Sequence, residues 1–109
     1  MTITGPDNLQ QDDEAVYTCT SYHSAPEPQI VWNILSEGKL HKIHENNTDV
    51  KTEDSRAGVT KTSKYTLQLS GIQPVSIIVY CVVEIAELKF KKSSELIEVL
   101  IICELKQVN

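Results

Sequence analysis

The chain of 109 residues has the length of one domain, and with 40% hydrophobic residues it can bury one modest core. A net charge of −5 with 10 basic residues argues against a nucleic-acid partner. The apolar run Val99–Cys103 is too short to span a bilayer, and the N-terminal MTITGPDNL lacks the basic and apolar segments of a signal peptide.

Short alternating runs separated by turn residues, without long helical periodicity, predict an all-β domain. A polar loop, GPDNLQQDDE, precedes the first expected strand, and turns are expected at SEGK, at GIQP and near Ala86-Glu87. The expected strands, in chain order, are 14–22, 29–35, 40–44, 49–52, 63–69, 76–85 and 88–101. Seven or eight such strands predict a β-sandwich of two antiparallel sheets.

Two of the three cysteines, Cys19 and Cys81, lie 62 positions apart, each in the middle of an expected strand and on its apolar face. The single tryptophan, Trp32, lies between them on a strand of its own. In a two-sheet sandwich, cysteines of opposite sheets can meet across the core, and an indole can pack on the sulfurs. Such a cross-link would stabilise the domain by about 3–4.5 kcal/mol and requires an oxidising compartment.

The order Cys19, Trp32, Cys81, with the alternating strand Tyr65–Leu69 before the last cysteine, resembles the immunoglobulin fold over about residues 8–101. The resemblance assigns these residues to strands B, C, F and E and implies an inter-sheet disulfide between Cys19 and Cys81. The core residues that it implies are Trp32, Tyr65, Leu67 and Leu69.

One departure from the family pattern concerns the tyrosine corner. Val79 stands two residues before Cys81, where many immunoglobulin domains have a tyrosine, and Val75 stands where an acidic residue is usual. This argues against a standard variable or intermediate set. The segments 24–32 and 81–93 are similar to those of membrane-proximal, constant/intermediate-like domains of nectins, the poliovirus receptor group and costimulatory ligands.

The strand 76–85 has apolar residues on both of its faces. If Cys81 points inward, Ile78, Tyr80 and Val82 point outward, and Val31 and Leu35 do so on the neighbouring strand. An exposed apolar stripe of this kind is typical of an interaction surface. Alternatively, loops, the long side chains of the last strand or a neighbouring domain cover it.

Two motifs are candidate chemical sites. Asn46-Asn47-Thr48 is an N-glycosylation acceptor in a polar loop, with Asn46 as the attachment point, although three-residue motifs also occur by chance. His41 and His44 would lie on opposite faces of a strand, which argues against a metal site, and no zinc-binding C-x-x-C pair is present. The chain contains no catalytic motif, so neither enzymatic activity nor a cofactor is expected.

The C-terminal part raises two further points. Leu88 and Phe90 have the opposite parity to Ile97 and Val99, which predicts a β-bulge or kink near Ser93-Ser94. Cys103 is the odd cysteine and follows the last strand. It could be an unpaired thiol, form an interchain disulfide or pair with a cysteine elsewhere. We expect one domain over 1–101 and a tail or linker over 102–109.

The resemblance implies an extracellular, non-enzymatic domain of a membrane-anchored adhesion or immune receptor, which acts by protein–protein recognition. The expected partner is another cell-surface protein or a second copy of the domain, beside neighbouring domains of the same chain, and no direct insertion into a membrane is expected. The alternatives are a structural spacer in a multi-domain receptor and a secreted decoy protein of the same fold.

Overall fold

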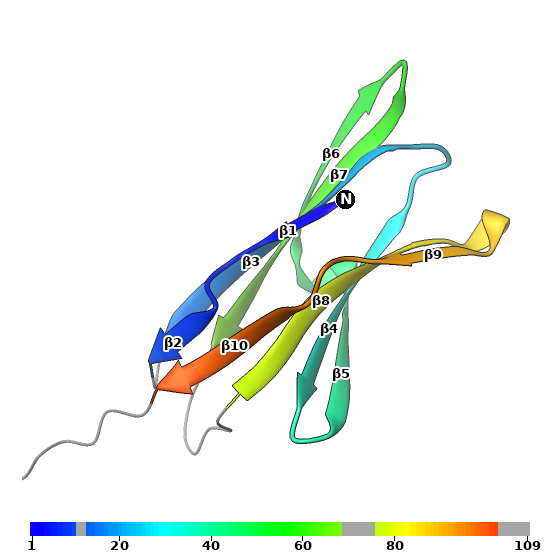
Figure 1. Ribbon diagram of the computed structural model, residues 1–109. Helices are drawn as coiled ribbons and strands as arrows, with labels where there is room; N and C mark the ends of the chain where they lie inside the picture. Colours follow the sequence, from blue (N-terminus) through cyan, green and yellow to red (C-terminus); the bar gives the residue numbers. More distant parts are fainter. Residues whose placement is uncertain (11–12, 69–75, 103–109) are drawn as a thin grey trace, which may run out of the picture.

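The computed structural model describes residues 1–10, 13–68 and 76–102. Within them the chain forms ten strands and two short 3-10 turns (Figure 1). The elements are β1 (Thr2–Thr4), β2 (Asn8–Gln10), β3 (Glu14–Ser24), β4 (Gln29–Ser36), β5 (Lys39–His44), η1 (Glu45–Asn47), β6 (Asp49–Ser55), β7 (Gly58–Gln68), β8 (Ser76–Ile85), η2 (Ala86–Leu88), β9 (Phe90–Ser93) and β10 (Ile97–Ile102).

The strands form two sheets that pack as a sandwich, which confirms the predicted fold class (Figure 1). The four-stranded sheet has the order β1-β3-β7-β6, and the six-stranded sheet has the order β2-β10-β8-β4-β5 with β9 also paired to β8. All pairs are antiparallel except β2 with β10, which is parallel. The structure has more strands than the sequence predicted because β1 and β2 precede the first expected strand and the last expected strand is divided into β9 and β10.

The first ten residues contribute a strand to each sheet, so the predicted leading loop was wrong in this part. β1 pairs with β3, whereas β2 pairs with β10 and inserts Leu9 into the core. Between them Gly5 lies against the Tyr17 ring so closely that a Cβ would fall 2.1 Å from a ring carbon. The Tyr17 hydroxyl donates to the Pro6 carbonyl at 2.8 Å and fixes this crossing.

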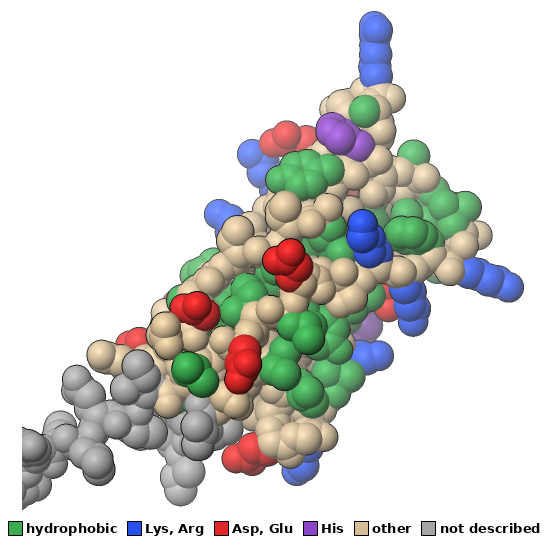
Figure 2. Space-filling view, viewed as in Figure 1, with side chains coloured by type: hydrophobic (Ala, Val, Ile, Leu, Met, Phe, Trp, Pro, Cys, Tyr) green, Lys and Arg blue, Asp and Glu red, His purple; other side chains and the backbone are tan. Residues whose placement is uncertain are grey.

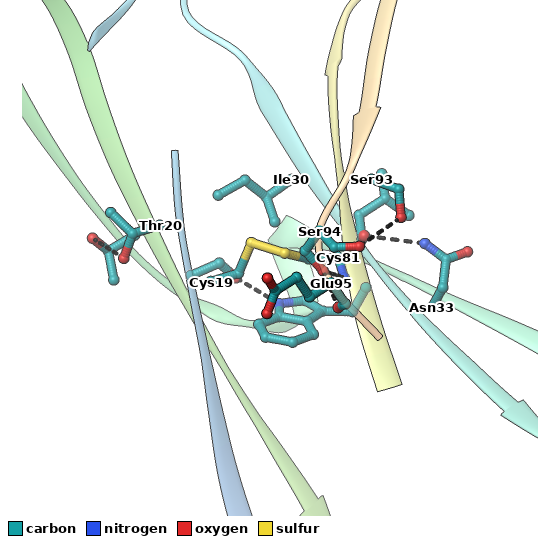
Figure 3. Close-up of a disulfide and its surroundings, with 12 residues drawn as sticks. Cys19, Thr20, Ile30, Asn33, Cys81, Ser93, Ser94 and Glu95 are labelled. Carbon is teal, nitrogen blue, oxygen red and sulfur yellow. Dashed lines mark hydrogen bonds between the residues drawn. A yellow bond between two sulfur atoms is a disulfide. The ribbon is translucent and has the colours of Figure 1, made fainter. Parts of the chain in front are cut away.

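The core is built on the predicted disulfide, which joins Cys19 of β3 to Cys81 of β8 (Figure 3). Trp32 lies directly opposite Cys81 in the β4–β8 register, and all three side chains are fully buried. Leu67 is buried nearby, whereas Tyr65 is partly buried with its ring centre 6.0 Å from that of Trp32. Leu69 lies outside the described residues.

The predicted irregularity of the last strand is confirmed at Ser94. Ser93 pairs with Val82 and Ile97 pairs with Val79, so four steps along one strand match three steps along β8. The Ser94 amide donates to the Cys81 carbonyl at 2.8 Å, and the Cys81 amide donates to Ser94 Oγ at 3.0 Å (Figure 3). The extra residue reverses the parity of the strand, as a β-bulge does.

A buried lysine closes one end of the sandwich, and nothing in the sequence pattern indicated it. Lys61 of β7 is 4% exposed, and its Nζ donates to the Pro28 carbonyl at 2.7 Å and to both Glu45 carboxylate oxygens at 3.0 Å. Glu45 Oε2 also accepts the Ile30 amide at 3.1 Å. The ion pair therefore ties β7 to the β3–β4 connection and to η1.

We predict that Lys61→Met lowers the free energy of unfolding by about 3 kcal/mol, because it leaves the Glu45 carboxylate without its buried partner. The value lies at the low end of the range for such pairs since Glu45 keeps 26% of its side chain exposed. Urea unfolding measures it, with Lys64→Met, an exposed lysine of the same strand, as the control. A loss no larger than that of the control would contradict the structural role of Lys61.

We predict that the burial of Tyr17 makes the folded domain less stable at alkaline pH. Burial, with a smaller contribution from the charge of Asp7, raises the pKa of Tyr17 to about 12 from 10.0. The stability that the neutral phenol provides is complete below pH 10 and is lost as the pH rises toward 12, because the unfolded state releases the proton first.

Thermal melts of the natural chain and of Tyr17→Phe between pH 8 and 12 measure this effect. We expect the variant to be about 1 kcal/mol less stable at pH 8, because the bond to Pro6 is lost. The difference should shrink or reverse above pH 11. Parallel pH curves for the two proteins would show that Tyr17 does not titrate with folding.

Candidate interaction surface

The side of the six-stranded sheet that faces away from the core carries an apolar patch. Leu40 of β5 pairs with Leu35 of β4, which in turn pairs with Ile78 of β8, so the three residues form one row across neighbouring strands. Tyr80 and Val82 follow at alternate positions on β8, on the same side as Ile78. We call these five residues the outer-face patch.

The patch is accessible to different degrees along its row. Leu40 is 46% exposed, whereas Leu35, Ile78, Tyr80 and Val82 are partly buried. Figure 2 shows hydrophobic side chains gathered over β8, β4 and β5. The buried residues of β8 alternate with the patch residues along the whole strand, as the sequence predicted.

Val31 requires a correction. It lies on the same side of β4 as Leu35, but it is 4% exposed and therefore buried, so its predicted exposure was wrong. Its register neighbours His44 and Val82 flank it on both sides in the middle of the sheet. Val31 therefore packs beside Val82 on the outer face and offers little surface to a partner.

Leu40 was missed by the sequence reasoning, although a signal was available. Glu37 and Gly38 both have positive φ, 52° and 77°, and form a two-residue turn between β4 and β5. Such a turn fixes the register of its hairpin and places Leu40 opposite Leu35. A two-residue turn with Glu37 and Gly38 at its centre, assigned from SEGK, would have predicted that Leu40 lies opposite Leu35.

Polar groups surround the patch and give it a mixed chemistry. A shallow hollow of about 190 Å³ beside Tyr80 is lined by Asn33, Lys42, Glu84 and Lys91 among others. Lys91 Nζ and Glu84 Oε1 lie 3.5 Å apart, and Glu98 continues the row of Leu35 and Ile78 on β10. The surface thus combines apolar anchors with a rim of both charge signs, an arrangement typical of protein interfaces.

The structure does not bring the remaining candidate residues to this patch. Asn46 lies in η1, at the far end of β5, with an exposed side chain. His41 and His44 face opposite sides of β5, and the described parts of the chain contain no group of three His, Cys, Asp or Glu side chains that could hold a metal ion. Cys103 lies outside the described residues.

Comparison with known proteins identifies the family. A family model described as the CD80-like C2-set immunoglobulin domain matches residues 1–92, from β1 through most of β9. The chain therefore belongs to this immunoglobulin domain family. Among curated proteins no sequence matches the chain.

The family carries a coarse functional meaning. C2-set domains are typically extracellular and non-enzymatic. The disulfide agrees with an oxidising compartment. Within residues 1–10, 13–68 and 76–102 there is no helix with the length and apolar character needed to cross a bilayer.

Proposed function

We propose that this domain is a recognition module of a cell-surface adhesion or immune receptor and binds a partner protein through the outer-face patch. The observation that carries the proposal is the row Leu40, Leu35 and Ile78, which places partly or well exposed apolar side chains on three neighbouring strands. Water contact with such a row is unfavourable, and a partner surface relieves it.

Tyr80 is the proposed central anchor of this interface. It lies between Ile78 and Val82 on β8, opposite Asn33, whose side-chain amide is buried and donates to the Val31 carbonyl at 3.2 Å. Tyrosine is frequent among the residues that dominate binding energy, because a rigid ring and a hydroxyl serve both apolar and polar contacts. The strand that carries Tyr80 is paired on both sides, which limits the entropy lost on binding.

The partner is either a second copy of the domain or another cell-surface protein. A second copy is chemically suited because acidic Glu98 of β10 borders the patch on one side and basic Lys42 of β5 borders it on the other. A two-fold axis along the strands would set β10 of one copy over β5 of the other and bring these opposite charges together.

The test is sedimentation velocity of the oxidised Cys103→Ser protein over a wide concentration range, beside a variant that also carries Ile78→Lys and Tyr80→Glu. We expect a concentration-dependent dimer that the double substitution weakens by roughly 30-fold or more, the loss of about 2 kcal/mol typical of a dominant anchor. Val16→Glu is the matched control, since Val16 is 48% exposed on the outer side of the opposite sheet.

Each alternative has its own result. A monomer at every concentration removes the second copy as partner, and binding of the labelled domain to cells that display other surface proteins then becomes the assay. Unchanged binding by a double variant whose disulfide and circular dichroism are intact would exclude the outer-face patch. Absence of any binding would favour the role of a structural spacer.

A further inference from the structure

The glycosylation motif Asn46-Asn47-Thr48 occupies the turn that joins the two sheets. Asn46 and Asn47 belong to η1, between β5 of the six-stranded sheet and β6 of the four-stranded sheet, and both side chains are exposed. The attachment atom, Nδ2 of Asn46, thus belongs to a side chain on the surface, and a large substituent there meets no packed core.

Thr48, the third residue of the motif, is in a different environment. Its hydroxyl donates to the Glu45 carbonyl at 2.8 Å and lies 2.8 Å from Ser63 Oγ, which is fully buried. Because the Thr48 hydrogen is used by Glu45, Ser63 must be the donor in the second contact. The Thr48 hydroxyl therefore donates its only hydrogen, and accepts a hydrogen bond, inside the domain.

This hydroxyl is the last link of a chain that begins in the core. Trp32 Nε1 donates to Ser63 Oγ at 2.9 Å, and Ser63 in turn donates to Thr48. The other side of the turn is held by Glu45, whose carboxylate accepts from buried Lys61 and from the Ile30 amide. Moving Thr48 away would break this chain and leave the buried Ser63 hydroxyl without its acceptor, which is costly.

We propose that Asn46 carries an N-linked oligosaccharide and that it is attached before the domain folds. The motif accepts serine or threonine at its third position, and these residues share only the hydroxyl, so the transferring enzyme must recognise that group. In the folded domain the hydroxyl of the partly buried Thr48 is hydrogen-bonded to Glu45 and Ser63. The unfolded chain alone presents Asn46 and a free Thr48 hydroxyl together.

The transfer balances with a lipid-pyrophosphate-linked oligosaccharide as the donor. Nδ2 of Asn46 forms a bond to C1 of the first sugar, the bond between C1 and the pyrophosphate oxygen breaks, and the lipid pyrophosphate leaves with the electron pair. One amide proton goes to a base of the enzyme, and one hydrogen remains on Nδ2.

The proposal rests on the extracellular character of the family and is independent of the outer-face patch as a binding site.

A glycan at Asn46 would leave the Leu40 end of the outer-face patch open and would border its Val82 end, because Val82 lies in one register row with Val31 and His44. It would emerge beside a hollow of about 360 Å³ lined by Gln29, Val31 and His44 among others, at the end of β5 that is remote from Leu40. His44 and Leu40 are four residues apart on one strand, which corresponds to about 13 Å. The oligosaccharide would thus border the surface near the buried Val31 and restrict partners to the Leu40–Tyr80 side.

The first test is expression of the full chain behind a secretory leader in eukaryotic cells, with intact mass measured before and after digestion by peptide N-glycosidase. We expect a mass increase that the enzyme removes and that Asn46→Gln abolishes. Asn47→Gln is the matched control, because it changes the neighbouring exposed residue of the same turn and keeps the motif. An unmodified natural chain from these cells would overturn the site.

The second test concerns the order of events. Purified transferase and lipid-linked donor are offered the disulfide-intact folded chain or the reduced, unfolded chain, with a short peptide of the same motif as a positive control. We expect at least tenfold less modification of the folded chain. Equal modification of the folded and unfolded chains would contradict attachment before folding. Modification of the peptide alone would contradict Asn46 as the attachment site. Neither result affects the test of the outer-face patch.

Discussion

The disulfide between Cys19 and Cys81, with Trp32 opposite Cys81, is the constraint on which the other features depend. It joins the two sheets at the centre and fixes which face of β3, β4 and β8 points inward. The backbone of Cys81 also receives both hydrogen bonds of Ser94, so the bulge of the last strand is positioned by the same residue. Trp32 extends the constraint through Ser63 to the turn that bears Asn46.

The outer-face patch is a consequence of this core. Because side chains alternate along a strand, burying Cys81 and Val79 obliges Ile78, Tyr80 and Val82 to face outward. The apolar character of both faces of β8 therefore has no explanation in the sandwich core alone. The strand β8, which bears three of the five patch residues, pairs with β4 on one side and with β9 and β10 on the other.

The ends of the sandwich are held by buried polar groups, whereas its centre is held by the disulfide and hydrophobic packing. At one end a charged group, Lys61, is buried and fully paired with Glu45 and the Pro28 carbonyl. At the N-terminal crossing, a buried phenol, Tyr17, holds the chain through the Pro6 carbonyl. Buried polar groups of this kind contribute little net free energy when satisfied but are expensive to break. They fix where the loops attach to a core whose hydrophobic packing is less directional.

The sequence by itself determined the all-β class, the cysteine and tryptophan framework, the parity of β8 and the interruption of the last strand, because each depends on alternation or spacing along one segment. Only the tertiary structure decided the pairing of Lys61 with Glu45, the burial of Val31 and the hydrogen bond between Thr48 and Ser63, because these depend on neighbours distant in sequence. The strands β1 and β2 belong to the second group, since three-residue segments are too short to show a period and gain their identity from the sheets that they join.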